Sequence, residues 1–242
     1  PSLSVSRGNS QPVVLHCHAG CTDEEILSAL DLSWPDLLGD DAPSKSDFER
    51  APWDHGEEVE AYEYYDRDEV HVYTVKRYEH PEMPWKTFRP YEPGVEYGPG
   101  LDDDTERELY RLPSVLEAAD EGGVVFVVEG EKDVHALEER GFTATTSGAA
   151  DSWKDRFSED LAGAKVVILP DNDDPGRELA EEAARSLYTE ADWTRIVELE
   201  DLPHGGDVSD WFARGHDREE LAEIVDNTPD VDASDVEAFV EE

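Results

Sequence analysis

The second half of the chain alternates strand-like and helix-like segments, and this alternation constrains the fold more than any other feature. Residues 124–128 form a β-branched run typical of a buried parallel strand, and the helical pattern that follows over 131–140 can end at Gly141. Strands that alternate with helices form a parallel sheet with helices on its faces, so we predict an α/β fold. Asp174 is the expected N-cap of a later helix, with Pro175 at its first position. The remaining segments of the pattern are strands at 142–146, 166–169 and 195–199 and helices at 152–161, 175–188, 208–213 and 218–225.

The first half of the chain has shorter patterns that predict a smaller, mixed α+β subdomain. A short strand is expected at 13–15, and residues 22–25 are typical of a capping box ahead of an apolar helical face at 26–30. Alternating apolar residues on both sides of a polar tetrapeptide at 66–69 predict two strands joined by a turn. Residues 81–100 are rich in Pro, Gly and aromatic side chains, so we expect a structured loop there.

The chain is strongly acidic. Its 242 residues contain 62 Asp and Glu against 20 Lys and Arg, which gives a formal net charge of −42, and the acids are spread along most of the chain. Such a surface is typical of proteins adapted to molar salt, where a Debye length of about 3 Å screens self-repulsion. We therefore predict a halophilic source, and in such salt an acidic balance does not exclude a nucleic-acid partner.

Membrane insertion and a disulfide scaffold are both excluded as organising principles. The longest apolar runs are far below the roughly 18 residues that a membrane span requires, and no basic and apolar leader opens the chain. We therefore expect a soluble, cytoplasmic protein without a membrane partner. The chain has two cysteines, Cys17 and Cys21, which are too few and too close together for a disulfide framework.

Acidic residues follow three of the predicted parallel strands, at the edge where ligands bind in such sheets. Glu129 ends the first strand, Asp171 and Asp173 follow the third, and Asp207 follows the fourth. If the chain stays extended, the period of two directs Asp171 and Asp173 to the same side. A single loop acid is usually only solvated, but carboxylates that converge from several strands suit Mg²⁺ or Mn²⁺.

These segments resemble a known family. Residues 125–133 (Val-Phe-Val-Val-Glu-Gly-Glu-Lys-Asp) and 171–176 (Asp-Asn-Asp-Asp-Pro-Gly) resemble the Toprim domain, a Rossmann-like fold shared by bacterial-type primases, phage primase-helicases, type IA and II topoisomerases and related nucleases. Residues 205–211 (Gly-Gly-Asp-Val-Ser-Asp-Trp) and 110–113 are similar to the phage and plasmid primase branch. The resemblance covers most of the chain and is strongest over 110–212.

The resemblance implies roles for five acids. Glu129 would act as general base or acid on a 3′-hydroxyl group, Asp171 and Asp173 would hold catalytic Mg²⁺ or Mn²⁺, and Asp133 and Asp207 would assist in metal binding. This chemistry fits carboxylates, because nucleotidyl transfer depends on divalent metal ions and on a positioned proton acceptor. No catalytic Tyr domain accompanies the motifs, so a topoisomerase is disfavoured.

The first residues resemble part of a zinc-binding module. Residues 1–5 and 15–21 are similar to the second half of that module in the phage and plasmid branch, with Cys17 and Cys21 as candidate ligands. A structural zinc site takes four ligands, and the histidines that flank Cys17 are too close in sequence to complete it. Zinc is therefore expected only if the missing ligands are supplied; otherwise the two thiols stay reduced and packed near the first helix.

A basic, aromatic segment precedes the acidic motifs. Its alternation of cations and rings suits phosphate contacts and base stacking along a single strand, although aromatic β-regions equally often form core. Lys132, on the first turn after Glu129, either faces a phosphate or is an ordinary surface lysine. The candidate nucleic-acid contacts are Lys76, Arg77, Lys86, Arg89 and Lys132, interleaved with Tyr78, Trp85, Phe88 and Tyr91.

Together these observations predict a DNA primase: Mg²⁺-dependent, template-directed synthesis of short primers from nucleoside triphosphates on single-stranded DNA, with a replicative helicase on another chain as a partner. Two alternatives stay open, a Toprim nuclease that hydrolyses phosphodiesters and a non-catalytic, replication-associated binding module. The expected domains are a zinc-module remnant with one helix at 1–40, a β-rich subdomain at 52–112, a Toprim domain at 113–228 and an acidic tail at 229–242.

Overall fold

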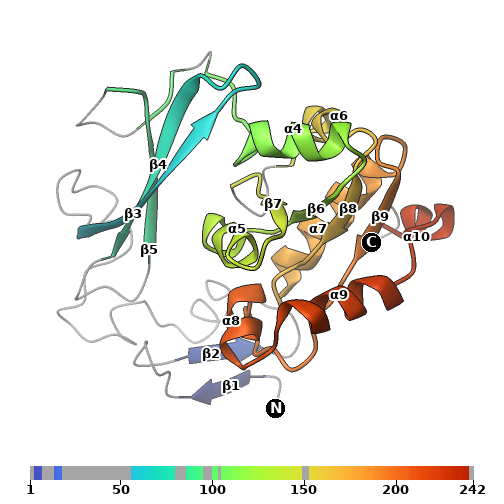
Figure 1. Cartoon of the computed structure of the whole chain (residues 1–242). Helices are drawn as coiled ribbons and strands as arrows, with labels where there is room; N and C mark the ends of the chain where they lie inside the picture. Colours follow the sequence, from blue (N-terminus) through green and yellow to red (C-terminus); the bar gives the residue numbers. More distant parts are fainter. Residues whose placement is uncertain are drawn as a thin grey trace. The chain divides into compact units, whose positions relative to one another are not determined.

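The computed structural model in Figure 1 describes residues 3–6, 14–17, 56–79, 86–94, 100–102, 105–148 and 153–239. The chain divides into two compact units. One comprises Pro1–Ala61, Val75–Tyr91 and Val95–Gly100, and the other comprises Tyr62–Thr74, Glu92–Gly94 and Leu101–Glu242. The domain boundaries expected from the sequence stay predictions.

The first described elements are two short antiparallel strands, β1 (Leu3–Ser6) and β2 (Val14–Cys17), paired so that Leu3 faces Cys17. The strand expected at 13–15 is thus confirmed and ends two residues later. The helix expected at 26–30, its capping box and Cys21 lie outside the described residues.

A three-stranded antiparallel sheet follows, with the order β3-β4-β5. The strand pair and turn predicted around 66–69 are confirmed, because the Asp66 carboxylate accepts hydrogen bonds from the amides of Asp68 and Val70, both at 2.9 Å, and so builds the turn. The strands are β3 (Glu57–Tyr65), β4 (His71–Glu79) and β5 (Lys86–Tyr91).

Strand β5 corrects the loop predicted at 81–100. Thr87, Phe88 and Tyr91 favour strand structure, and Pro90 is tolerated because β5 lies at the edge of the sheet, where one side of the strand needs no ladder hydrogen bond. The prediction failed because the density of Pro and Gly on both sides of these residues outweighed their β propensity.

The second half of the chain forms a parallel sheet with the order β7-β6-β8-β9, which confirms the predicted α/β fold. In its register, Val127 is paired with Thr145 on one side and with Ile168 on the other, so the strands end close to one level. The strands are β6 (Val124–Val127), β7 (Thr143–Thr145), β8 (Lys165–Ile168) and β9 (Trp193–Ile196).

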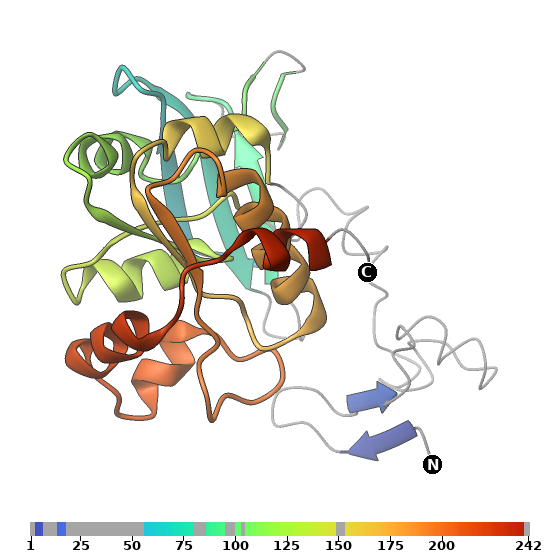
Figure 2. The same cartoon turned by 90° about the vertical axis from the view of Figure 1, so that its right-hand side faces the viewer.

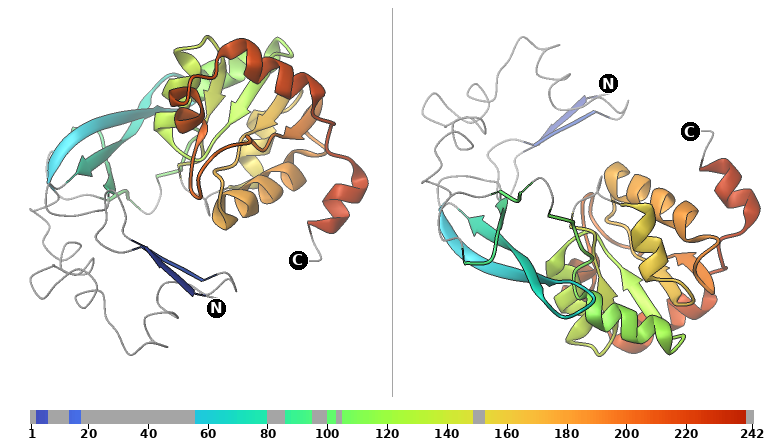
Figure 3. Two further views of the ribbon diagram at one scale, coloured as in Figure 1. Left: turned by 90° about the horizontal axis from the view of Figure 1, so that it is seen from below. Right: turned by 90° about the horizontal axis from the view of Figure 1, so that it is seen from above.

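Helices cover both faces of this sheet (Figures 2 and 3). On one face Val125 and Val127 pack in a cluster with residues of α4, α6 and α7, whereas Phe126 points to the other face and contacts Phe142 at 4.7 Å between ring centroids. Helix α4 was not predicted, although Pro113 in its first turn and the buried Val115 are signals for it. The helices are α4 (Leu112–Asp120), α5 (Glu131–Glu138), α6 (Asp155–Asp160), α7 (Asp174–Leu187), α8 (Val208–Ala213), α9 (Arg218–Asn227) and α10 (Ala233–Ala238).

The last described residues pack against the sheet domain. The Val231 amide donates a hydrogen bond to the Thr194 carbonyl at 2.7 Å, and Val231 and Phe239 contact the hydrophobic core. Among the helices of the described residues, none combines the length and the apolar character that crossing a lipid bilayer demands.

Candidate metal centre

Two neighbouring parallel strands bring the first two acidic segments to one edge of the sheet. The Leu169 amide donates to the Val127 carbonyl at 2.9 Å, so the chain leaves β6 toward Glu129 beside the chain that leaves β8 toward Asp171. The hydroxyl group of Thr146, just after β7, donates to the Glu129 carbonyl at 2.6 Å. The backbone that carries Glu129 is therefore held from both sides.

The segment after β8 turns back at once, which corrects the expectation of an extended chain. The Asp173 amide donates to the Asp171 carbonyl at 2.8 Å, a tight turn in which the period of two no longer applies. Asp173 rather than Asp174 is the N-cap of α7, and its carboxylate accepts from the Gly176 amide at 2.9 Å. Both aspartates are good capping residues, so the sequence alone did not decide between them.

Asn172 fastens this turn to the loop that carries the third acidic segment. Its amide donates to the Gly206 carbonyl, and the Gly205 amide donates to the Asn172 carbonyl, both at 2.9 Å. Its side-chain amide also donates to the Leu202 carbonyl at 2.9 Å. These bonds place Asp207 next to the Asp171 turn, although 36 residues separate the two in the sequence.

A glycine in the first turn of α7 makes this close packing possible. A Cβ atom on Gly176 would lie 2.6 Å from the Asp171 carbonyl oxygen and 2.8 Å from its amide nitrogen, both on the backbone. A larger residue would push the helix away from the Asp171 turn.

The five acids predicted as a site act on one another electrostatically. Burial and then the charges of Glu129, Asp133, Asp207 and Asp173 raise the pKa of Asp171 to about 8. Burial and the charges of Asp173 and Asp133 also raise the pKa of Glu129. Burial and the charge of Asp207 raise the pKa of Asp133 to about 6. The three acidic segments therefore face a common region.

These carboxylates differ in their partners. Glu129 Oε2 is buried and has no hydrogen-bond partner in the described part of the chain. Asp133 Oδ1, by contrast, accepts from the hydroxyl group of Ser209 at 2.6 Å, and Asp207 caps α8 by accepting from the Asp210 amide at 2.8 Å. Lys132 contacts Asp207 Oδ2 and lies 3.8 Å from Asp133 Oδ1. Although burial opposes it, this contact raises the pKa of Lys132.

The donor set fits a hard divalent cation. Mg²⁺ and Mn²⁺ prefer carboxylate oxygens and keep several waters, so one or two direct protein ligands are enough. The unpartnered oxygen of Glu129 and the raised pKa of Asp171 agree with a place for positive charge. Among the described residues, no three His, Cys, Asp or Glu side chains form a ready-made ligand cluster. The site therefore suits an ion held largely through water and a bound phosphate.

Sequence reasoning missed a buried support for this edge. The hydroxyl group of Tyr64 donates to Glu131 Oε1 at 2.8 Å, and both side chains are buried. The Tyr64 ring also stacks on Tyr73 at 4.5 Å between centroids. Burial and the Glu131 charge raise the pKa of Tyr64, so the tyrosine stays a donor. Glu131, the second glutamate after β6, was a signal of this support in the sequence, but its partner Tyr64 lies 67 residues away.

The predicted nucleic-acid contacts on β4 and β5 have different surroundings. Lys76 pairs with Glu58 at 2.9 Å, and Arg77 pairs with Glu79. Lys86 is exposed, and Arg89 is partly buried. These contacts do not test whether the four cations bind nucleic acid. Cys17 lies in β2, and its role as a zinc ligand also stays a prediction.

The aromatic rings of this segment divide between core and surface. Tyr91 is buried and shares a hydrogen bond with Tyr78 at 3.0 Å between hydroxyl oxygens, so these rings belong to the sheet's packing. Phe88 is 48% exposed, so among the described rings of this segment it is the one most available for stacking. Trp85 lies outside the described residues.

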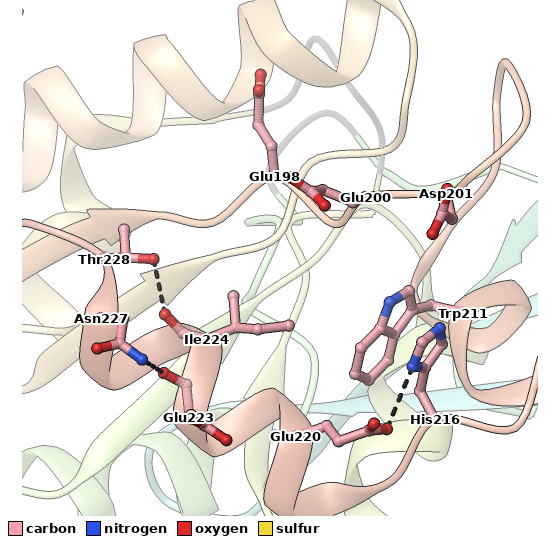
Figure 4. Close-up of a pocket in the computed structure, with 10 residues that line it drawn as sticks. All are labelled: Glu198, Glu200, Asp201, Trp211, His216, Glu220, Glu223, Ile224, Asn227 and Thr228. Carbon is pink, nitrogen blue, oxygen red and sulfur yellow. Dashed lines mark hydrogen bonds and ion pairs between the residues drawn. The ribbon is translucent and has the colours of Figure 1, made fainter.

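Two cavities lie beside the loop that follows β9. One, of about 460 Å³, includes Asp171 and Arg177 in its lining. The other, of about 560 Å³, contains the stacked rings of Trp211 and His216, 4.1 Å apart between centroids (Figure 4). Five carboxylates line the same cavity, so it repels a triphosphate and does not suit a nucleotide. They belong to Glu198, Glu200, Asp201, Glu220 and Glu223.

Solved structures with a similar fold include catalytic domains of primases. A DnaG catalytic core aligns with a TM-score of 0.54 and 22% identity, over 74% of this chain and 54% of that chain. The Aquifex aeolicus primase, with its zinc-binding and RNA polymerase domains, aligns with a TM-score of 0.53 and 20% identity, over 87% of this chain and 50% of that one. A DNA primase domain from Pseudomonas aeruginosa aligns with a TM-score of 0.52 and 22% identity, over 69% of this chain and 50% of that one.

Sequence comparison points in the same direction over a shorter span. The primase homolog protein of Arabidopsis thaliana is 32% identical over 110 residues, which cover 37% of this chain and 32% of that protein. No protein-family model matches the sequence. The chain thus spans about half the length of the solved primases and about a third of the Arabidopsis protein. The structural likeness shows that the fold is that of primase catalytic cores.

Proposed function

We propose that this chain is a DNA primase-type nucleotidyltransferase that makes short primers from nucleoside triphosphates on a single-stranded DNA template. The observation that carries the proposal is that the segments of Glu129 and of Asp171 and Asp173 leave neighbouring strands at one edge of the parallel sheet, where burial and nearby carboxylates raise the pKa of Glu129 and of Asp171. The primase folds and the Arabidopsis relative support it. The finer assignments, to the phage and plasmid branch and to a halophile, rest on the motif at 205–211 and on the charge of −42.

In this proposal the acids have distinct tasks. Asp171 and Asp173 would hold Mg²⁺ or Mn²⁺, which supplies positive charge to the triphosphate and the attacking oxygen when bound. Glu129, with its unpartnered oxygen, would accept the proton of the primer's 3′-hydroxyl group. The hydrogen bond from Thr146 to the Glu129 backbone and the cap that Asp173 makes on α7 would keep these side chains oriented.

The single-stranded DNA template would run along the basic and aromatic side chains of β4 and β5. Lys76, Arg77, Lys86 and Arg89 would contact phosphates, with Phe88 as a stacking surface. We also propose that unwinding comes from a helicase on another chain. A zinc ion would bind at Cys17 and Cys21 only if further ligands complete its shell.

The test is primer synthesis by Asp171→Asn and Asp173→Asn variants in molar KCl with Mg²⁺. Loss of product to background is expected from each, because each removes a carboxylate from the metal centre. Asp226→Asn, an exposed acid on α9, is the matched control and should keep full activity. Unchanged synthesis by both site variants would refute the assignment.

The nuclease alternative is separated by the product. The same carboxylates and metal can hydrolyse a phosphodiester, in which case a labelled strand becomes shorter without any triphosphate. A primase instead yields new oligonucleotides only when triphosphates are present. A binding module without catalysis would bind single strands and show no turnover, even with Glu129 intact.

A further inference from the structure

The five acids of the candidate centre fall into two groups that differ in how their charge is balanced. Asp133 Oδ1 accepts from both the amide and the hydroxyl group of Ser209, at 3.3 and 2.6 Å. Asp207 Oδ1 accepts from the Asp210 amide at 2.8 Å, and its Oδ2 contacts Lys132. Glu129 Oε2, by comparison, has no hydrogen-bond partner among the described residues. Asp173 Oδ1 accepts from the Gly176 amide at 2.9 Å. The difference is therefore one of charge: Asp133 and Asp207 have Lys132 beside them, whereas Glu129, Asp171 and Asp173 form no ion pair with a cation of the described residues.

Lys132 lies between Asp133 and Asp207. Its ammonium group contacts Asp207 and stands 3.8 Å from Asp133, whose side chains are only 13% and 6% exposed. The Lys132 side chain itself is 39% exposed, so solvent reaches it from one side. Two nearly buried carboxylates from separate segments thus share one cation of the chain. This is the arrangement in which a divalent ion would otherwise be needed to offset their repulsion.

We propose that the Lys132 ammonium group is a built-in cation that takes the place of a second divalent ion between Asp133 and Asp207. The centre then binds one divalent ion, at Glu129, Asp171 and Asp173, rather than two. The location of that single ion rests on the proposed function, whereas the role of Lys132 rests on its own contacts. The proposal reassigns Asp133 and Asp207, which the sequence had suggested as metal ligands, to holding the lysine.

Two features favour this role over phosphate binding by Lys132. Lys132 is the sequence neighbour of Asp133 on the first turn of α5, so its side chain starts beside the carboxylate whose charge it offsets. Ser209, on the first turn of α8, donates to Asp133 Oδ1, the same oxygen that Lys132 approaches, and so holds this carboxylate in place. An ammonium group also tolerates an irregular ligand set, whereas Mg²⁺ requires near-octahedral geometry.

The test counts Mn²⁺ ions bound to the full chain in molar KCl, using the electron paramagnetic resonance signal of the free ion. We expect one saturable site in the wild type and in Lys132→Arg, which keeps the charge. Lys132→Gln should bind two ions that show magnetic coupling, because the vacated position is close to the first ion. Lys154→Gln, at the exposed N-cap position of α6, removes the same charge elsewhere and should still bind one ion.

A double variant identifies the new site. Lys132→Gln with Asp207→Asn should return to one ion, and Asn still caps α8 because it is as good an N-cap as Asp. Equal ion counts in the wild type and Lys132→Gln would overturn the proposal, as would a second ion that Asp207→Asn does not remove. Lys132→Met provides a second variant, and circular dichroism of each variant checks folding.

The same measurements keep this proposal separate from the proposed function. If Asp171→Asn with Asp173→Asn leaves the wild-type ion bound, the location proposed for the catalytic metal is wrong. The gain of an ion in Lys132→Gln and its loss with Asp207→Asn would still support the role of Lys132.

Discussion

The charged side chains at the edge of the parallel sheet and those on the three-stranded sheet differ in whether they have a partner of opposite charge. On the three-stranded sheet, cations and acids form local pairs, such as Lys76 with Glu58 at 2.9 Å. At the parallel edge, Glu129 keeps a buried oxygen without a partner and the pKa of Asp171 rises to about 8. Exposed pairs contribute only about 0–1 kcal/mol each, whereas buried, uncompensated carboxylates oppose folding. The difference is the one expected if this edge retains destabilising charge in order to bind a ligand, as we propose.

The largest effect expected from this comparison is on catalysis. Glu129→Gln should lower primer synthesis by roughly 10²–10⁴-fold, the range typical of a lost proton acceptor. It should not lower the thermal unfolding midpoint, because Glu129 Oε2 has no protein partner in the described residues to lose. Glu58→Gln, which breaks an exposed pair on the other sheet, is the control and should leave synthesis within about twofold. If the Glu129→Gln variant were less stable than the wild type but still active, Glu129 would act in stability and not in catalysis, the opposite of what we expect.

A second, smaller effect concerns the support beneath the edge. Tyr64→Phe removes a buried hydrogen bond to Glu131 and should destabilise the protein by about 1–3 kcal/mol, measured by urea unfolding. Tyr65→Phe removes the exposed bond from Tyr65 to Glu63 at 2.7 Å and should change stability by less than about 0.5 kcal/mol. Equal losses in the two variants would show that burial does not distinguish these tyrosines.

A third effect, no larger than the second, sharpens the comparison from the side of the three-stranded sheet. Phe88→Ala should weaken single-stranded DNA binding by about 1–3 kcal/mol, the usual contribution of one stacked base, with folding unchanged because the ring is 48% exposed. Fluorescence anisotropy of a labelled oligonucleotide measures this loss. Val59→Ala, an exposed apolar residue on β3, is the control. Identical affinities of Phe88→Ala and wild type for single-stranded DNA would show that Phe88 does not stack on the template.

The sequence predicted what depends on local pattern. The parallel strands, helix α5 ahead of the left-handed Gly141 and the acids at the strand ends follow from periodicity, capping and the rule that ligands bind at one edge. Strand β5 was missed because its edge position, which makes Pro90 acceptable, is a property of the sheet and not of the segment.

What depends on pairing across the chain was not predictable. The partners Tyr64 and Glu131 are far apart in sequence, and the contact between Lys132 and Asp207 spans 75 residues. The turn at Asp171 departs from the extended expectation because Asn172 is bonded to Gly205 and Gly206, which belong to a later loop. Local rules describe each segment, and the site arises from how the segments meet.

The central claim is that acids from separate segments share one divalent ion at the edge of the parallel sheet. Crystals soaked in Mn²⁺ and measured at the manganese absorption edge test it most directly. The account predicts an anomalous peak in contact with the carboxylates of Glu129 and of Asp171 or Asp173. No peak there, at a Mn²⁺ concentration that supports primer synthesis, or side chains of these residues that point apart, would contradict it.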